Sequence, residues 1–182
     1  MAERPVLRLP EPVLKRAADP VAAVGAEERA LADDLLDTMR VSPACVGIAA
    51  PQIGVSVRAF CIDVTGHKKA DSCHGEVVLF NPEIVVARAP EVAREGCMSV
   101  PDLTGNVARA TEVVVQGLDV DGTVRVIEAN AFEARALLHE IDHLDGLLFL
   151  DRVASIKTDI FRRQTYERRR GSGPASRGAS PD

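Results

Sequence analysis

Apolar side chains recur every four residues in the first third of the chain. Leu31, Leu35 and Met39 form this stripe. Gly25 precedes it, and two glutamates follow that glycine, where carboxylates favour the start of a helix through its dipole. A Ser-Pro pair at 42–43 interrupts the pattern, because proline cannot continue a helix. The spacing therefore predicts an amphipathic helix in this interval.

Residues 131–144 form the strongest helical stretch. They include no Gly or Pro and consist mainly of Ala, Leu, Glu and Arg, which are good helix formers. Gly146 follows them, where a left-handed C-terminal cap favours glycine. Residues 155–170 show a basic amphipathic pattern, whereas 171–182 contain no large apolar side chain. We predict helices over 131–144 and 155–170 and a disordered tail from 171 to 182.

Shorter runs of β-branched and apolar residues, bounded by turn residues, predict strands. The predicted strands cover residues 57–64, 77–80, 84–87, 111–120, 123–127 and 147–150. Asp121-Gly122 joins the fourth and fifth of these, which predicts a hairpin, because this dipeptide favours a tight two-residue turn. Residues 7–21 are punctuated by proline and predict an irregular lead-in, and the polar residues 65–75 predict a loop.

Composition narrows the class of protein. The chain has 182 residues, 46% hydrophobic and 27% charged, which favours one globular domain over residues 1–170. A net charge of −5 argues against direct DNA binding, and no apolar run reaches the roughly 18 residues of a membrane span. The N-terminus lacks the layout of a secretory signal, and the four cysteines form no C-x-x-C pair. We therefore expect a cytoplasmic protein with reduced thiols and no membrane partner.

The sequence HEIDH at 139–143 lies inside the second predicted helix. His139 and His143 are four residues apart, so both imidazoles would lie on one helix face and reach a single cation. Glu140 would then face a water on that cation and act as the general base of a hydrolase. The alternative is a solvated helix with two histidines, which the scarcity of histidine in this chain makes the weaker interpretation.

A catalytic metal site needs a third protein ligand. A metzincin-like extension would place a histidine where this chain has Phe149, which excludes that class. A thermolysin-like site would take Glu167 as its third ligand. This glutamate directly precedes three arginines, which favours a solvated surface charge over a metal ligand. Cys97, upstream of the motif helix, would as a thiolate complete a Cys-His-His site with one open position.

Two further stretches contain unusual chemistry. Residues 45–54 are small side chains that enclose one amide, Gln52. On its own this pattern favours a tightly packed connection over a ligand-binding wall. The predicted polar loop contains His67, Cys73 and His74, which we interpret as surface residues, because no further ligand lies at a characteristic spacing.

Together, three stretches resemble the motifs of the peptide deformylase family, in the family's order and at comparable intervals. These are GIAAPQ at 47–52, EGCMS at 95–99 and HEIDH at 139–143. The resemblance covers about residues 7–165. It implies an α+β fold in which antiparallel sheets pack around a central helix that contains the HExxH motif. It also implies hydrolytic removal of the N-terminal formyl group from formyl-methionyl nascent polypeptides, with release of formate.

The resemblance assigns roles to individual residues. Cys97, His139 and His143 would hold one divalent cation, with Fe(II) expected and Zn, Ni or Co as possible substitutes. Glu140 would accept a proton from the attacking water and deliver it to the departing amine. The Gln52 side-chain amide and the backbone N–H of Met98 would stabilise the oxyanion.

The substrate side of the site follows from the first motif. The resemblance implies that Gly47, Ile48 and Cys45 contact the substrate, with the backbone near Gly47 pairing with an extended peptide as an added strand. The family usually has Gly at the position of Cys45, so we expect this thiol to line the cleft. It also usually has Leu where Met98 stands, a swap that conserves volume, and Gln where Leu138 precedes the first histidine. The expected partner is a formyl-methionyl nascent chain at the ribosome, bound by a monomer.

Two hypotheses concern the surroundings of the ligands. Glu95, two residues before Cys97, is predicted to form a bidentate ion pair with Arg109 and so hold the ligand loop. Asp142 either orients a ligand histidine or is a charge on the helix surface. Two other functions remain as alternatives: a metallopeptidase, and a non-catalytic binder of formyl peptides, which would be expected to lack the base or a ligand.

Overall fold

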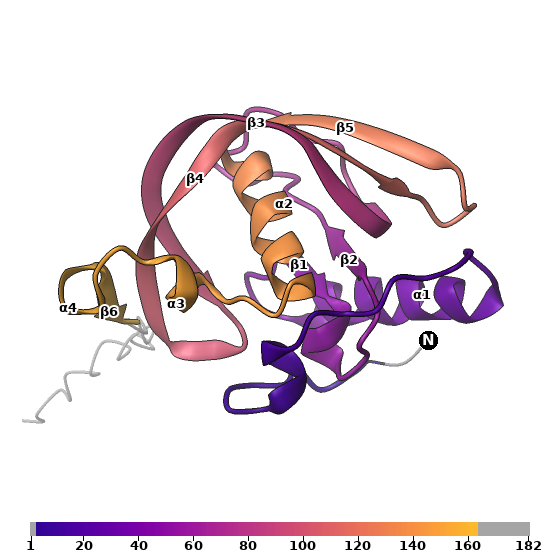
Figure 1. The fold of residues 1–182 in the computed structure, drawn as a ribbon, viewed down its shortest axis with the longest axis horizontal. Helices are drawn as coiled ribbons and strands as arrows, with labels where there is room; N and C mark the ends of the chain where they lie inside the picture. Colours follow the sequence, from indigo (N-terminus) through magenta and orange to yellow (C-terminus); the bar gives the residue numbers. More distant parts are fainter. Residues whose placement is uncertain (1–2, 164–182) are drawn as a thin grey trace, which may run out of the picture.

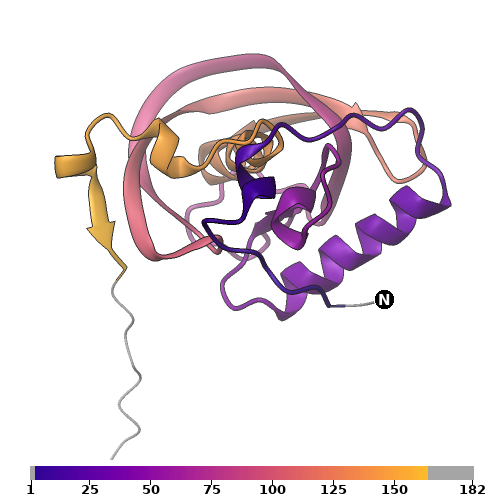
Figure 2. The same cartoon turned by 60° about the horizontal axis from the view of Figure 1, so that its bottom comes forward.

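An antiparallel sheet wrapped around one helix organises residues 3–163, the part of the chain that the computed structural model describes. Figure 2 shows this helix, α2, almost end-on inside the curved sheet. The strands are β1 (Gly47–Ala49), β2 (Ala59–Ile62), β3 (Val77–Cys97), β4 (Val100–Leu118), β5 (Val124–Asn130) and β6 (Ile160–Arg162). The helices are η1 (Pro12–Lys15), α1 (Ala26–Val41), η2 (Ala50–Ile53), α2 (Ala131–Leu144), α3 (Phe149–Arg152) and α4 (Ile156–Asp159). The predicted fold class is confirmed.

The longest feature of the sheet is the hairpin of β3 and β4, which arches over α2 in Figure 1. Two short strands were predicted where β3 runs for 21 residues. The prediction broke the strand at Asn81-Pro82 and ended it at residue 87, but Pro82 lies at a register shift between Phe80 and Glu83, where its missing N–H interrupts little pairing. The predicted hairpin across Asp121-Gly122 is confirmed as β4 and β5, with Gly122 at φ 78°.

Both helices predicted in the first 150 residues are confirmed. α1 begins after Gly25, whose backbone N–H donates to Glu28 Oε2 at 2.8 Å. α2 ends before Gly146, which has φ 71° and lies so close to the Arg16 backbone that a Cβ atom would be 2.7 Å from its carbonyl carbon. The Gly146 turn therefore satisfies both a left-handed cap and a close approach of the lead-in segment.

The core places α2 at the centre of the molecule. Its apolar face packs against the concave side of the sheet in a cluster that includes Phe60, Leu79, Val115, Ile127 and Leu137. α1 packs on the other side of β1 and β2 through a second cluster that includes Leu35, Met39, Ile48, Cys61 and Phe80. Close packing of this apolar face fixes the position of α2. No helix within residues 3–163 is long and apolar enough to cross a membrane.

The end of the described chain differs from the prediction. The strand predicted over 147–150 is wrong: α3 begins at Phe149, whose ring is fully buried beside Gly105. The helix predicted over 155–170 is wrong in its described part, where the single turn α4 is followed by β6. β6 pairs with residues 103–105 of β4. The backbone groups of residues 160–162 therefore bond to the edge of β4, whereas in a longer helix they would have bonded to neighbouring turns. The remainder of that predicted helix and the predicted tail lie outside the described residues.

Candidate metal centre

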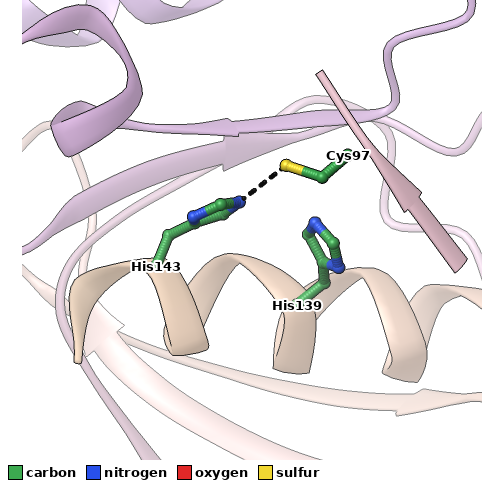
Figure 3. Close-up of side chains that lie close together, drawn as sticks. All are labelled: Cys97, His139 and His143. Carbon is green, nitrogen blue, oxygen red and sulfur yellow. Dashed lines mark hydrogen bonds between the residues drawn. The ribbon is translucent and has the colours of Figure 1, made fainter. Parts of the chain in front are cut away.

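Three side chains from distant parts of the sequence meet beside α2. The ligand atoms of Cys97, His139 and His143 all lie within 4.8 Å of one another. Figure 3 shows both histidines projecting from one face of α2 toward the cysteine at the end of β3, with Cys97 Sγ 3.2 Å from His143 Nε2. The helical spacing of the motif and the tip of the β3–β4 hairpin thus produce the predicted grouping.

The donor set suits a divalent transition metal. One sulfur and two imidazole nitrogens are ligands that Zn and Fe accept, and they leave a position for water. Burial disfavours the thiolate of Cys97, but the charge of His143 and hydrogen bonds from His139 and His143 outweigh it and lower the pKa of Cys97 well below its ordinary value. Within residues 3–163 two buried side-chain atoms lack a hydrogen-bond partner, His143 Nδ1 and Glu140 Oε2. The residues present therefore fit a bound cation with a reactive water beside it.

A buried carboxylate orients the first histidine. Glu95 Oε2 lies 3.0 Å from His139 Nδ1, which leaves the other ring nitrogen for the cation. Burial raises the pKa of Glu95, but hydrogen bonds from His139 and Arg109 outweigh this and lower the pKa to about 2. Glu95 and Cys97 are two residues apart on β3 and share one face of the strand, a spacing from which this contact was predictable.

Arg109 holds this carboxylate and a second one. Its Nε and Nη2 donate to the two Glu95 oxygens at 2.6 and 3.0 Å, which confirms the predicted bidentate pair. Its Nη1 donates to Asp142 at 2.8 Å, and Asp142 also accepts from Arg152. Neither prediction for Asp142 matches, because its buried carboxylate touches two arginines and no histidine. Arg135, which sequence reasoning missed, donates to Glu95 from one helical turn before His139.

The amide of Gln52 points at the same centre. The Ala49 N–H donates to Gln52 Oε1 at 2.9 Å, which fixes the orientation of the amide. Its Nε2 then donates to Ser99 Oγ at 3.1 Å and lies 3.5 Å from Cys97 Sγ. Ser99 is fully buried and was not predicted as part of the site. Residues 45–54 therefore pack tightly and also present a donor beside the ligand sulfur.

Glu140 occupies a closed position next to the ligands. Burial raises the pKa of this carboxyl to about 7, although the charges of His139 and His143 act in the opposite direction. A Cβ atom on Gly47 would be 2.7 Å from Glu140 Oε1. Only glycine at this position leaves the carboxylate where it lies.

The remaining predicted substrate contacts divide into two groups. Cys45, Gly47 and Met98 line a cavity of about 440 Å³ together with Gln52, Cys97, His139 and Glu140. Ile48 does not line it, because its side chain is fully buried in the core. Burial and the charge of Glu140 raise the pKa of the half-buried Cys45 thiol to about 12, and its sulfur donates to Gly47 O at 3.1 Å.

The polar loop is attached to α2. His74 Nδ1 lies 3.0 Å from the fully buried Glu133, and the His67 ring stacks on Phe132 with centroids 3.6 Å apart. No metal cluster forms from loop residues in the described part of the chain, where Cys97, His139 and His143 are the one such group. Glu167, the alternative third ligand, lies outside the described residues.

Comparisons with known proteins agree with this geometry. The family model described as polypeptide deformylase matches residues 3–159. A peptide deformylase of Acidobacterium capsulatum is 38% identical over 93% of this chain and 98% of its own length. One from Mesorhizobium japonicum is 42% identical over 88% of this chain and 89% of its own.

Solved structures show the same fold. The crystal structure of a peptide deformylase from Legionella pneumophila is 40% identical, with a TM-score of 0.78 over 86% of this chain and 89% of that one. The enzyme from Ehrlichia chaffeensis, solved in complex with actinonin, is 32% identical, with a TM-score of 0.80 over 86% of this chain and 92% of that one. This chain belongs to the polypeptide deformylase family and has its activity, the metal-dependent hydrolysis that removes the N-terminal formyl group from formyl-methionyl polypeptides and releases formate.

Proposed function

We propose that Cys97, His139 and His143 hold the cation of this deformylase and that Glu140 is its general base. The observation that carries the proposal is the buried Glu140 Oε2, which has no partner in the described structure and lies beside the three ligands. The cation, when bound, supplies Lewis acidity that lowers the pKa of a water and polarises the formyl carbonyl. We propose Fe(II) as the natural metal on the resemblance to the family, and the mixed sulfur and nitrogen donor set accepts this ion as it accepts Zn.

Proton transfer is assigned to Glu140. Its carboxylate accepts a proton from the attacking water as the C–O bond forms at the formyl carbon. The same carboxyl then delivers that proton to the methionine nitrogen as the C–N bond breaks, so formate and a free amine leave. Burial raises the pKa of this carboxyl above its ordinary value, which favours a group that can hold the proton between the two transfers.

Two hydrogen-bond donors are assigned the stabilisation of the negative charge that develops on the formyl oxygen. Gln52 Nε2 is held by its Oε1 contact to the Ala49 N–H, so it is preorganised and needs no rearrangement during the reaction. Met98 lines the cavity at the turn between β3 and β4, where its backbone N–H is the proposed second donor.

The substrate is proposed to bind as an added strand. β1 pairs with β2 and stands at the end of the strand order, so its other edge faces the cavity side and offers backbone groups. Gly47 and Cys45 would contact the peptide there, and Ile48 only through its backbone. On the resemblance to the family, we propose a monomeric enzyme that acts on nascent chains at the ribosome in the cytoplasm.

Formate release from a formyl-methionyl tripeptide, assayed anaerobically with iron restored, tests the proposal. Glu140→Gln should keep metal stoichiometry while kcat falls by about 10²- to 10⁴-fold, because the amide is nearly isosteric but cannot take the proton. Metal analysis of both proteins is the control. Near-native kcat in the fully loaded variant would remove Glu140 from this role.

A further inference from the structure

Two exposed arginines lie in the lining of the cavity that Gly47 at the start of β1 also lines. Arg94 belongs to β3, three residues before Cys97, and Arg163 follows β6. Neither forms an ion pair with a carboxylate within residues 3–163. Their charges are therefore uncompensated in the described part of the chain.

Neutral partners hold Arg94 in place. Its Nε donates to Asn106 Oδ1 at 2.9 Å and its Nη1 to Thr104 Oγ1 at 3.3 Å. The guanidinium carbon also lies 3.5 Å from the centroid of the Phe161 ring, a cation–π contact with β6. These contacts fix the position of the guanidinium and leave its charge available, and within residues 3–163 its hydrogen bonds are made by Nε and Nη1.

Arg163 reaches the cavity because β6 replaces the helix predicted there. Its backbone N–H donates to Asp102 O at 2.8 Å, which continues the pairing along β4. Its guanidinium lies against Gly96, so closely that a Cβ atom at Gly96 would collide with it. The guanidinium of Arg163 therefore lies beside the residue that directly precedes Cys97.

The third arginine in the lining, Arg135, does not share this property. It is buried, and its donors are engaged by Glu95 Oε1 and by the carbonyls of Val107 and Glu91. The contrast separates a structural arginine from the two that face the open cavity. Of the carboxylates in the lining, Glu95 is bound to Arg109 and Arg135, and Glu140 lies in the closed position beside Gly47.

We infer that Arg94 and Arg163 form a subsite that favours formyl-methionyl substrates with a carboxylate side chain shortly after the methionine. This inference rests on the proposed function, which places the formyl group at Cys97, His139 and His143 and runs the peptide along the cavity. A peptide added to the edge of β1 would lie in the cavity that these guanidiniums also line, and planar guanidinium groups bind carboxylates in a bidentate manner. The class of favoured substrate is an acidic nascent N-terminus.

Amidated peptides test the subsite without interference from a terminal carboxylate. The series is formyl-Met-Ala-Ala-Ala-amide with Glu, Gln or Lys at the second, third or fourth position, one at a time. At one of these positions we expect kcat/KM of the Glu peptide to exceed that of the Gln peptide by about fivefold. This ratio corresponds to the contribution of one or two partly exposed ion pairs. The Lys peptide should fall below the Gln peptide, and 0.5 M salt should shrink the difference.

Variants are compared by the ratio of kcat/KM for the Glu peptide to kcat/KM for the Gln peptide, measured within each protein. The ratio should fall toward one in R94Q/R163Q. In R94E/R163E, kcat/KM should be higher for the Lys peptide than for the Gln peptide. The matched control is R162Q, because Arg162 is exposed on β6 beside Arg163 and does not line the cavity. A ratio near one in the unmodified enzyme at every position, or a ratio that R94Q/R163Q leaves unchanged, would overturn the inference.

Binding provides a readout that does not need turnover. The same peptides are titrated calorimetrically into the metal-loaded Glu140→Gln variant, where tighter binding of the Glu peptide is expected by the same ratio. If no peptide releases formate from the unmodified enzyme, the proposed function fails, while the binding ratio still decides on the subsite. Equal affinities for Glu, Gln and Lys peptides would refute it.

Discussion

Gly47 shows how one missing methyl group positions Glu140, the proposed base. A Cβ atom there would be 2.7 Å from Glu140 Oε1 and 3.0 Å from its Cδ, so a side chain must displace the carboxylate. We expect Gly47→Ala to lower kcat by about 10- to 100-fold, because displacements near 1 Å cost this much. Steady-state formate release with metal analysis measures it.

The effect should pass through Glu140. In a Glu140→Gln background, adding Gly47→Ala should therefore cost much less than it does in the unmodified enzyme, because the displaced group no longer transfers the proton. Equal losses in both backgrounds would show that Gly47 acts on substrate binding alone.

Glu95 predicts an acid limit of stability. Its pKa is lowered to about 2 from an ordinary 4.5, so its contribution is fully present above pH 4.5 and is lost as the pH falls toward 2. The loss is on the order of 3 kcal/mol at 1.36 kcal/mol per pKa unit. Denaturant unfolding between pH 5 and 2.5 should show this fall in the free energy of unfolding.

The control for Glu95 is an exposed glutamate. Glu95→Gln should lower stability at pH 6 and flatten its dependence below pH 4.5, since the variant has no proton to bind there. Glu128→Gln, exposed on β5, should leave the pH profile unchanged. The same steep profile in Glu95→Gln would assign the acid sensitivity to other carboxylates.

At the scale of elements, local patterns, including the β4–β5 hairpin, were predictable, whereas pairings between residues far apart in the sequence were not. α2 was predicted with its observed bounds, because the absence of Gly and Pro and the glycine after it are properties of neighbouring residues. β3 was cut at Pro82 because a bulge that tolerates proline appears only once β4 is beside it. The helix predicted through β6 failed for the same reason, since its competitor was the distant edge of β4.

The candidate site divides along the same line. The grouping of Cys97, His139 and His143 beside Glu140 was predictable because each lies in a short motif, and the place of Glu95 was predictable from strand alternation. Ser99 was missed because its contact with Gln52 joins residues 47 apart. Arg94 and Arg163 carry no local signal, because the β3–β4 hairpin and β6 bring them together only in the folded chain.

The cation is expected to stabilise the junction of β3 and α2. Cys97 ends β3 and the two histidines belong to α2, so a bound ion cross-links two elements that the sequence separates. At a metal concentration 1,000 times the Kd, binding adds about 4 kcal/mol, which corresponds to roughly 10 °C in Tm. Thermal unfolding with and without a chelator measures the shift.

Cys97→Ala provides the control for this shift. Its Tm should not respond to chelator, because two histidines alone bind a cation weakly. A chelator effect of the same size in Cys97→Ala would place the stabilising metal elsewhere in the molecule.

At the scale of the whole molecule, one buried arginine joins the parts that build the site. Arg109 on β4 contacts Glu95 on β3 and Asp142 on α2, and Asp142 in turn binds Arg152 of α3. Arg109 and both of its carboxylate partners are buried, so none of these charges is screened by water. The arrangement holds the hairpin, the motif helix and α3 in one register around the three ligands.

Removing Arg109 should therefore destabilise the protein and loosen the metal centre together. Arg109→Gln leaves two buried carboxylates short of a partner, so we expect a loss of about 3–5 kcal/mol in the free energy of unfolding and weaker metal binding through His139. Arg109→Lys should lose less, because it keeps the charge but not the forked geometry that binds both Glu95 oxygens.

Arg88→Gln, exposed on β3, is the matched control and should change stability by less than about 0.5 kcal/mol. Denaturant unfolding and competition with a metal indicator measure the two effects. If Arg109→Lys lost as much stability as Arg109→Gln while metal affinity stayed at its native value, the network would support the fold without positioning the ligands.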